Sequence, residues 1–183
     1  MTSRPIALVD MDGTICDFKG AMNSQLDELA SANEPDHRSF TIDNRPYYLR
    51  VRQRLIKTLP SFWRDLKPIQ LGIDLVSTLR SMDFNVHVLT RGPSKNGVAW
   101  GEKLEWCRRH LPNDIQITVT QDKSLTYGRV LVDDWPPYIE GWLAHRPRGL
   151  VIMPDHDWNA SVKHPQVIRM TNDTQKQVLE ALQ

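Results

Sequence analysis

Short runs of consecutive apolar residues recur along the chain, and turn-forming or polar residues close each of them. In chain order the runs are 5–10, 85–90, 114–120, 129–134, 149–154 and a weaker one at 165–170. Continuous apolar runs are typical of strands that are buried on both faces of a parallel sheet. The pattern therefore predicts five such strands and indicates a sixth.

Segments with helical spacing separate several of these runs. Apolar residues recur three or four positions apart in 69–82 and 98–111, and over shorter stretches in 138–145 and 174–183. Strands that alternate with helices predict a parallel sheet covered by helices on both faces. We therefore expect an α/β fold, a three-layer sandwich with a mostly parallel, Rossmann-like sheet.

One long interval breaks this alternation directly after the first strand. Residues 17–67 contain no convincing strand, but they show two helical patterns, at about 18–33 and 46–59, with a polar stretch between them. We expect a small helical cap at 17–67. Residues 1–16 and 68–183 would then form the core domain.

The ends of the predicted strands carry the side chains that are suited to chemistry. In chain order these are Asp10, Asp12, Thr90, Lys123, Asp133 and Asp134. Lys123 lies in the loop after the third strand, and the others close the first, second and fourth strands. Because ligands of open parallel sheets gather outside the carboxyl ends of the strands, we expect these groups to converge at one edge.

Carboxylates packed this closely repel one another, so ionising all of them requires a counter-charge. Mg²⁺ suits such a site, since it takes one or two carboxylates and completes its shell with water and phosphate oxygens. The ammonium group of Lys123 would add positive charge. Together these groups indicate a site for a phosphoryl group, whose transfer depends on positioning and on neutralising charge.

Composition and charge limit the class of protein and the compartment in which it is expected. Hydrophobic residues make up 40% and charged residues 25% of the 183 residues, which is typical of a soluble globular protein. A formal net charge of +1 argues against holding nucleic acid by bulk electrostatics, although it leaves a local basic groove open. Two cysteines, Cys16 and Cys107, are too few for a disulfide framework or a zinc site. Without a signal-peptide core or a bilayer-spanning stretch, a cytoplasmic protein with no membrane partner is expected.

The strand ends also carry a resemblance to a known superfamily. The stretch "DMDGT" (10–14) has the form D-x-D-G-T and resembles the first motif of the haloacid dehalogenase-like (HAD-like) phosphohydrolases. Thr90 resembles their second motif, Lys123 the third, and "VDD" (132–134) the fourth. The four motifs follow the order of the superfamily, and the resemblance spans about residues 5–155.

This resemblance implies a phosphatase with defined roles for four residues. Asp10 would be the nucleophile that forms an aspartyl-phosphate. Asp12 would protonate the leaving oxygen as general acid and then activate water as general base. Thr90 would donate a hydrogen bond to a phosphoryl oxygen, and Lys123 would neutralise the intermediate.

The resemblance also implies Mg²⁺ as the cofactor. Its ligands would be the carboxylate of Asp10, the backbone carbonyl of Asp12 and one acid of the pair Asp133 and Asp134. Analogy with the superfamily favours Asp134 as the ligand and Asp133 as an orienting carboxylate.

A narrower resemblance concerns the substrate. Five segments are similar to the 5′(3′)-deoxyribonucleotidase group, namely "DMDGTICDF" (10–18), "FWRDLKPI" (62–69), "GEKLEW" (101–106), "TQDKSLTYG" (120–128) and "LVDDW" (131–135). The group removes phosphate from nucleoside monophosphates. On this interpretation Phe18, Phe62 and Trp63 would form aromatic walls around the base, and Lys103 would reach toward the phosphate. Because Phe62 and Trp63 are adjacent, one is expected in the pocket and one in the core, and which is which stays open.

The chain also departs from that group. Its second-motif threonine is followed by Arg91-Gly92-Pro93, where the group usually has Ser-Pro. Arg91 would add charge beside the phosphate, which leaves the choice of substrate open. The cap segment 34–58 matches poorly, so base preference, deoxy or ribo preference and 5′ or 3′ preference do not carry over.

Two other functions remain open from the sequence. One keeps the chemistry on another substrate, as a polynucleotide 3′-phosphatase or a sugar phosphatase, with Arg91 and the basic run 45–57 lining a groove for a nucleic-acid end. The other is a non-catalytic module that binds a nucleotide or a protein. Intact motif residues argue against the second. The sequence gives no indication of the oligomeric state.

Overall fold

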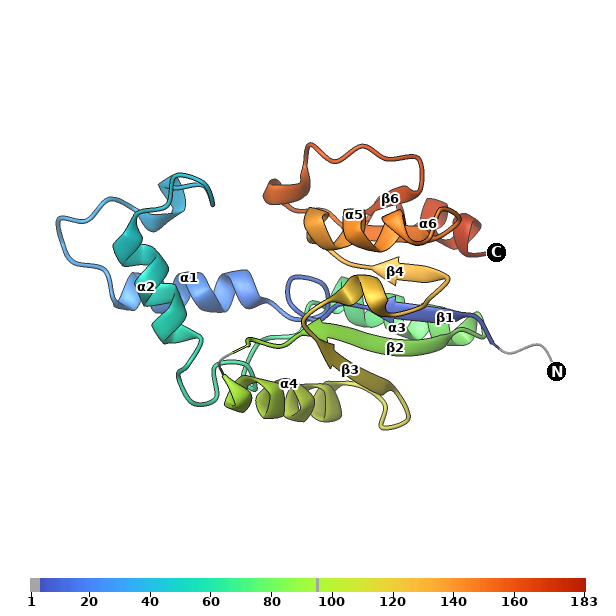
Figure 1. The fold of residues 1–183 in the computed structure, drawn as a ribbon, viewed down its shortest axis with the longest axis horizontal. Helices are drawn as coiled ribbons and strands as arrows, with labels where there is room; N and C mark the ends of the chain where they lie inside the picture. The colour runs from blue at the N-terminus through green and yellow to red at the C-terminus, as the bar shows by residue number, and fades with distance from the viewer. Residues whose placement is uncertain (1–3, 95) are drawn as a thin grey trace.

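Six parallel strands form a single sheet in the computed structural model, which describes residues 4–94 and 96–183 (Figure 1). The strands are β1 (Ile6–Val9), β2 (Asn85–Arg91), β3 (Gln116–Thr120), β4 (Val130–Val132), β5 (Leu150–Pro154) and β6 (Val167–Met170). Their order across the sheet is β3-β2-β1-β4-β5-β6. The chain reverses its direction of travel between β1 and β4, so the ends of these two strands border the crevice where ligands bind in open sheets of this kind.

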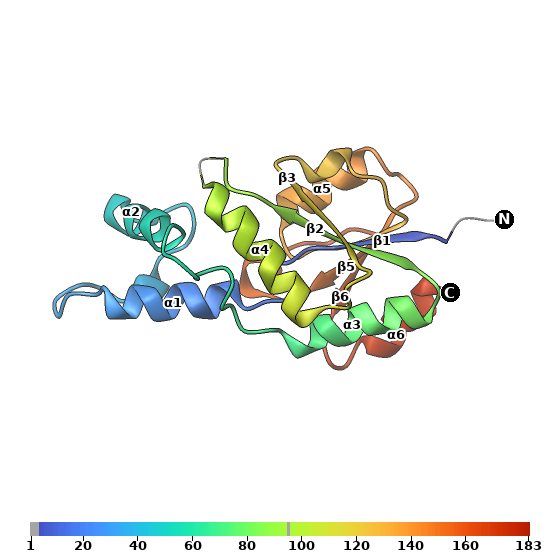
Figure 2. The same cartoon turned by 90° about the horizontal axis from the view of Figure 1, so that it is seen from below.

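Helices cover both faces of the sheet, as the alternation of strands and helices predicts. Strand side chains alternate between the faces, so Ala7 and Val9 belong to one apolar cluster and Leu8 to the other. The first cluster includes residues of α3 (Gln70–Ser81), α4 (Gly97–His110) and α6 (Gln175–Leu182). The second includes residues of α5 (Pro136–Ala144). Figure 2 shows α3, α4 and α6 together on one side of the sheet. The three-layer α/β architecture is therefore confirmed.

Most elements end one to three residues inside the predicted ranges. The expected strand 129–134 shrinks to β4, so both following aspartates lie beyond the strand, at its carboxyl end. The expected strand 114–120 begins only at Gln116, because Ile115 closes a turn by donating its backbone N–H to Pro112. No helix in the described part of the chain is long and apolar enough to cross a bilayer.

The segment after β1 forms a two-helix insertion. It contains α1 (Phe18–Glu28), a short 3₁₀ turn η1 (His37–Ser39) and α2 (Tyr47–Ile56). Met22 and Leu26 of α1 pack against Leu49 and Ile56 of α2, so the insertion has an apolar cluster of its own. Figure 1 shows both helices projecting beyond the carboxyl ends of the strands. Both helices are shorter than the predicted 18–33 and 46–59, because polar and proline-containing loops follow or precede them.

The return segment of the insertion is fastened to α4 of the core. The carboxylate of Glu102 accepts hydrogen bonds from the backbone N–H groups of Ser61 (2.6 Å) and Trp63 (3.1 Å). One turn further along α4, the indole of Trp106 donates to the carbonyl of Leu66 (2.7 Å). Glu102 and Trp106 are both buried. These contacts fix the direction in which the insertion leaves the core.

We expect Glu102→Ala to lower the free energy of unfolding by about 2 kcal/mol or more, because it leaves two backbone N–H groups without an acceptor. Urea denaturation followed by circular dichroism measures this change. Glu105→Ala is the matched control on the same helix, since Glu105 is exposed and its one ion pair within the described residues is with Arg64 at 3.6 Å. Equal effects of the two substitutions would contradict the clamping role of Glu102.

Candidate active site

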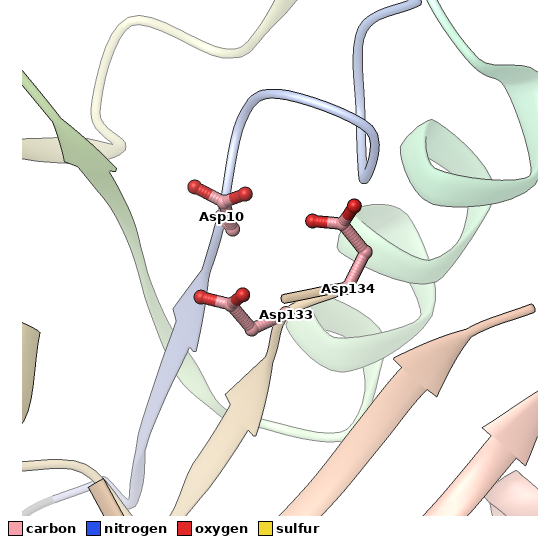
Figure 3. Close-up of side chains that lie close together, drawn as sticks. All are labelled: Asp10, Asp133 and Asp134. Atoms are coloured by element: carbon pink, nitrogen blue, oxygen red, sulfur yellow. The ribbon is translucent and has the colours of Figure 1, made fainter. Parts of the chain in front are cut away.

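Three buried carboxylates converge at the ends of β1 and β4. Asp10 follows β1, whereas Asp133 and Asp134 follow β4 (Figure 3). Each offers one oxygen atom, and these atoms all lie within 4.8 Å of one another. All three residues are buried. The sheet places them together because β1 and β4 are parallel neighbours, with Val9 in register with Val132.

One buried lysine enters this group of acids. Lys123 lies at the start of the 3₁₀ turn η2 (Lys123–Leu125), in the connection between β3 and β4. Its ammonium group contacts Asp10 (2.5 Å) and Asp133 (2.7 Å). Asp133 is held from the other side by the backbone N–H of Trp135 (3.0 Å). Lys123, itself held by Asp133, therefore fixes the position of the Asp10 carboxylate.

Burial changes the protonation of these acids. It raises the pKa of Asp10 to about 7, with Lys123 opposing the shift and Asp133 adding to it. Burial also raises the pKa of Asp134 to about 9, and the charges of Asp10 and Asp133 contribute. Burial alone would lower the pKa of Lys123, but Asp10 and Asp133 outweigh it and raise that pKa. The protein alone thus supplies too little positive charge to ionise all three acids.

This imbalance fits a divalent cation. Among the described residues, Asp134 has no cationic side chain within 4.0 Å, whereas Asp10 and Asp133 share Lys123. Three carboxyl groups beside one ammonium group form a pocket of hard oxygen atoms, which is the donor set that Mg²⁺ prefers. Asp10 and Asp134 are the residues best placed to hold such an ion.

A second lysine links the other two predicted residues. Lys103 of α4 is fully buried, and its ammonium group contacts the carboxylate of Asp12 and the hydroxyl of Thr90 (2.9 Å). The side chain of Asp12 is 26% exposed, in contrast to the buried Asp10. Asp12 is therefore accessible to solvent while the buried Lys103 holds its carboxylate. The sequence suggested a phosphate partner for Lys103, and its partners here are Asp12 and Thr90.

Gly13 is required by the position of Asp134. Its φ is +81°, and a Cβ atom built there would lie 2.5 Å from Oδ2 of Asp134. The carbonyl of Gly13 contacts the imidazole of His156 (2.7 Å). A glycine at this position lets the chain turn directly over the acidic cluster.

Two residues after β5 hold Asp134 and were not predicted to do so. The indole of Trp158 donates to Oδ2 of Asp134 (3.0 Å). The buried amide of Asn159 donates to the backbone carbonyls of Asp134 (2.9 Å) and Pro154 (2.8 Å). The sequence signal that could have identified them is their place after a core strand, at the same edge as the acids. Their polarity alone did not distinguish them from loop residues.

The aromatic residues predicted to line the pocket pack against one another. Phe18 stacks on Trp63 with ring centroids 5.3 Å apart, and Phe62 meets both rings edge to face. Trp63 is only 4% exposed, whereas Phe18 and Phe62 are partly exposed. Trp63 is thus the core member of the adjacent pair, and Phe62 is the one with an accessible surface. Lys103 lies 4.4 Å from the centre of the Trp63 ring, which joins this group to the site.

Arg91 points toward a different group. Its guanidinium donates to the hydroxyl of Tyr138 (2.8 Å) on α5, and the Tyr138 ring lies 4.8 Å from the ammonium nitrogen of Lys123. Tyr138 thereby covers Lys123 on the side of α5. A separate cavity of about 470 Å³ lies between α1 and residues 59–67, but none of the four predicted carboxylates lines it.

Solved structures with the same fold are HAD hydrolases. The HAD-hydrolase YfnB from Bacillus subtilis bound to magnesium has a TM-score of 0.63 at 15% identity, over 98% of this chain and 100% of that chain. A HAD family hydrolase from Deinococcus radiodurans with bound phosphate and sodium has a TM-score of 0.60 at 11% identity, over 98% and 96%. At these identities the likeness shows the fold alone, which is that of the HAD-like hydrolases.

The sequence comparisons are more specific. The family model described as "5' nucleotidase, deoxy (Pyrimidine), cytosolic type C protein" matches residues 4–181. A Bordetella bronchiseptica relative, provisionally named a 5′(3′)-deoxyribonucleotidase, is 32% identical over 162 residues, 84% of this chain and 85% of its own. The human cytosolic-type 5′(3′)-deoxyribonucleotidase is 30% identical over 140 residues, 69% of each chain. The chain therefore belongs to this nucleotidase family of HAD-like phosphatases, and it is a phosphoric monoester hydrolase.

Gly13→Ala is expected to disable the site. A side chain at φ +81° costs roughly 1–2 kcal/mol, and the added methyl group would displace the carboxylate of Asp134. We expect weakened Mg²⁺ binding by calorimetry and a large loss of phosphatase activity. Gly101→Ala on α4 is the control, because nothing lies within 4 Å of its added Cβ and alanine favours the helix. Full activity of Gly13→Ala would contradict the assigned geometry.

Binding of a divalent cation should release protons. Because the pKa values of Asp10 and Asp134 are raised to about 7 and about 9, the ion-free protein retains protons that the cation must displace. We expect Mg²⁺ affinity to rise between about pH 6 and about pH 9 and to level off above. Calorimetry in two buffers of different ionisation enthalpy measures the protons released. Asp134→Asn should reduce the number of protons released on Mg²⁺ binding. Asp157→Asn changes an exposed carboxylate at the rim and should leave that number unchanged. An Mg²⁺ affinity that does not depend on pH would refute the prediction.

Proposed function

We propose that this protein is a Mg²⁺-dependent nucleotidase that hydrolyses nucleoside monophosphates through an aspartyl-phosphate on Asp10. The observation that carries the proposal is the arrangement of Asp10 between Lys123 and the Asp133–Asp134 pair, with Asp12 at the mouth of the same site. A nucleophile, an acid–base group and cationic partners thus share one edge of the sheet.

In the first half of the reaction, a carboxylate oxygen of Asp10 attacks phosphorus and the bond to the ester oxygen breaks. Asp12 gives its proton to the departing oxygen, so the product leaves as an alcohol. The partial exposure of Asp12 suits this role, because the leaving group must lie on the open side of the site. In the second half, Asp12 takes a proton from water, the water oxygen attacks phosphorus, and the carboxylate of Asp10 is released with inorganic phosphate.

The remaining residues neutralise or hydrogen-bond the negatively charged phosphoryl group. Lys123 stays close to Asp10 throughout and offsets the negative charge that develops on the phosphoryl oxygens. The hydroxyl of Thr90 accepts from Lys103, which leaves its own hydrogen free to donate to a phosphoryl oxygen. Mg²⁺, held by Asp10, Asp134 and the backbone carbonyl of Asp12, would supply the positive charge that allows both carboxylates to ionise.

The substrate is inferred from the family and from the insertion. Its relatives are named as 5′(3′)-deoxyribonucleotidases, which points to nucleoside monophosphates. Phe18 and Phe62 offer partly exposed aromatic surface on which a base can stack, and the Trp63 ring that both contact lies 4.4 Å from the ammonium nitrogen of Lys103. The insertion stands over the carboxyl ends of the strands, so it would limit access to compact substrates.

Asp10→Asn is expected to abolish turnover while the fold persists, since the side-chain volume barely changes. We expect phosphate release to fall by roughly a thousandfold or more, measured on p-nitrophenyl phosphate and on a panel of nucleoside monophosphates. Asp157→Asn serves as the control for loss of a carboxylate at the rim. Beryllofluoride should bind the wild-type protein and not the Asp10→Asn variant. An active Asp10→Asn variant would show that Asp10 is not the nucleophile.

The same panel separates the alternatives. Turnover of 3′-phosphorylated oligonucleotides or of sugar phosphates, with nucleoside monophosphates untouched, would replace the proposed substrate while keeping the chemistry. No phosphate release from any ester in the presence of Mg²⁺ would favour a non-catalytic binding module.

A further inference from the structure

A stripe of unpaired cations runs along α2. Arg50, Arg54 and Lys57 recur at spacings of four and three residues, which places them on one face of the helix. Arg52 faces elsewhere and is fully paired with Glu34 (2.5 and 2.8 Å). Among the described residues, no carboxylate lies within 4.0 Å of a cationic nitrogen of the stripe. The stripe therefore carries positive charge that the protein itself does not neutralise.

Lys57 is the residue of the stripe that lies nearest the candidate active site. Its ammonium group lies 5.5 Å from the centre of the Phe18 ring, the aromatic residue nearest the DxD motif in sequence. Its backbone carbonyl accepts from the indole of Trp63 (3.1 Å) and from the side chain of Asn96 (2.9 Å), which N-caps α4. Lys57 is therefore held by both the return segment and the core. Burial lowers its pKa, and the negative charge of Asp12 is the main opposing influence.

Arg45 extends the same surface. Its guanidinium donates to the side chain of Gln53 (3.0 Å), which lies one turn before Lys57 on α2. Like Lys57 it is partly buried, and no carboxylate among the described residues pairs with it. A half-buried cation without an anionic partner is unfavourable in the free protein, so an anion from outside would improve its surroundings.

The negative charge of the phosphate that reacts is neutralised by other residues. Lys123 and Lys103, which belong to the core, contact the carboxylates of Asp10 and Asp12 directly. The stripe lies on the insertion, and its Lys57 is close enough to Asp12 for the charge of Asp12 to act on it. Because Asp12 protonates the leaving group in the proposed reaction, this positive charge lies near the part of the substrate that does not react.

We propose that Lys57, Arg54 and Arg45 form a subsite for a second phosphate group on the leaving-group side of the substrate. The proposal rests on the proposed function, because it assumes that a phosphate ester is hydrolysed at Asp10. Two compounds carry this chemistry, namely a nucleoside 3′,5′-bisphosphate and the phosphorylated end of an oligonucleotide. Both place an additional phosphate one nucleoside away from the reacting one.

The test compares thymidine 5′-monophosphate, thymidine 3′,5′-bisphosphate and a 3′-phosphorylated tetranucleotide. For the wild type we expect a higher kcat/KM on at least one of the two longer substrates than on the monophosphate, mostly through KM. Lys57→Met should lower that preference about tenfold or more, the value of one charge-assisted hydrogen bond, and Lys57→Arg should retain most of it. Lys176→Met on the distant helix α6 removes an equally charged side chain and should leave the preference intact.

Each outcome of this comparison either supports or overturns the proposed subsite. A loss confined to the bisphosphate identifies a small-molecule substrate, and a loss that includes the tetranucleotide identifies a nucleic-acid end; both support the subsite. Equal losses on all three substrates would mean that Lys57 serves the reacting phosphate. An unchanged preference, or no preference in the wild type, would likewise overturn the proposal.

Equilibrium binding keeps this test apart from that of the catalytic proposal. Calorimetry with the Asp10→Asn variant should show tighter binding of the bisphosphate than of the monophosphate, and Lys57→Met in that background should remove the difference. If the wild-type protein hydrolysed none of the esters but this binding difference held, the nucleotidase proposal would fail and the subsite would stand. Equal affinities in an active enzyme would reject the subsite alone.

Discussion

The whole arrangement depends on keeping several carboxylates in a small buried space. Asp10, Asp133 and Asp134 lie where two parallel strands end side by side, and only Lys123 among the described cations enters between them. Burial and mutual repulsion raise the pKa of Asp10 to about 7 and that of Asp134 to about 9. Such a cluster is unfavourable for the fold by itself and becomes favourable when positive charge arrives. The chemistry of the site therefore fits a divalent cation.

Residues after β5 and in β6 help to hold this cluster in place. The loop after β5 supplies Trp158 and Asn159 to the residue that follows β4. Asn159 is in turn fixed by Arg169 of β6, which donates to its side-chain oxygen (2.9 Å) and to its backbone carbonyl (2.9 Å). The outermost strand thus supports the site without contacting it. Rigid support of this kind positions catalytic groups better than the acidic residues could by themselves.

The sequence predicted the sheet and the acidic cluster because both depend on local patterns. Apolar runs reveal buried strands, and the polar residues that close them must meet at one edge of a parallel sheet. The partners of those residues depend on tertiary packing and were less accessible. Asn159 and Tyr138 resemble ordinary loop and helix residues until the chain is folded, and Arg91 donates to the hydroxyl of Tyr138, whose ring covers Lys123. Adjacent aromatic residues such as Phe62 and Trp63 could be separated into exposed and core positions only by the structure.

Helix α4 connects the insertion to the candidate active site through two consecutive residues, Glu102 and Lys103. Glu102 holds the backbone of the return segment, and Lys103 holds Asp12 and Thr90. Ser61 and Trp63 of the return segment are thus bonded to the residue that precedes Lys103 on α4. Trp63 strengthens this link, since its backbone bonds to Glu102 while its ring lies against the ammonium group of Lys103. A single turn of α4 therefore holds both the return segment of the insertion and the side chain of Asp12.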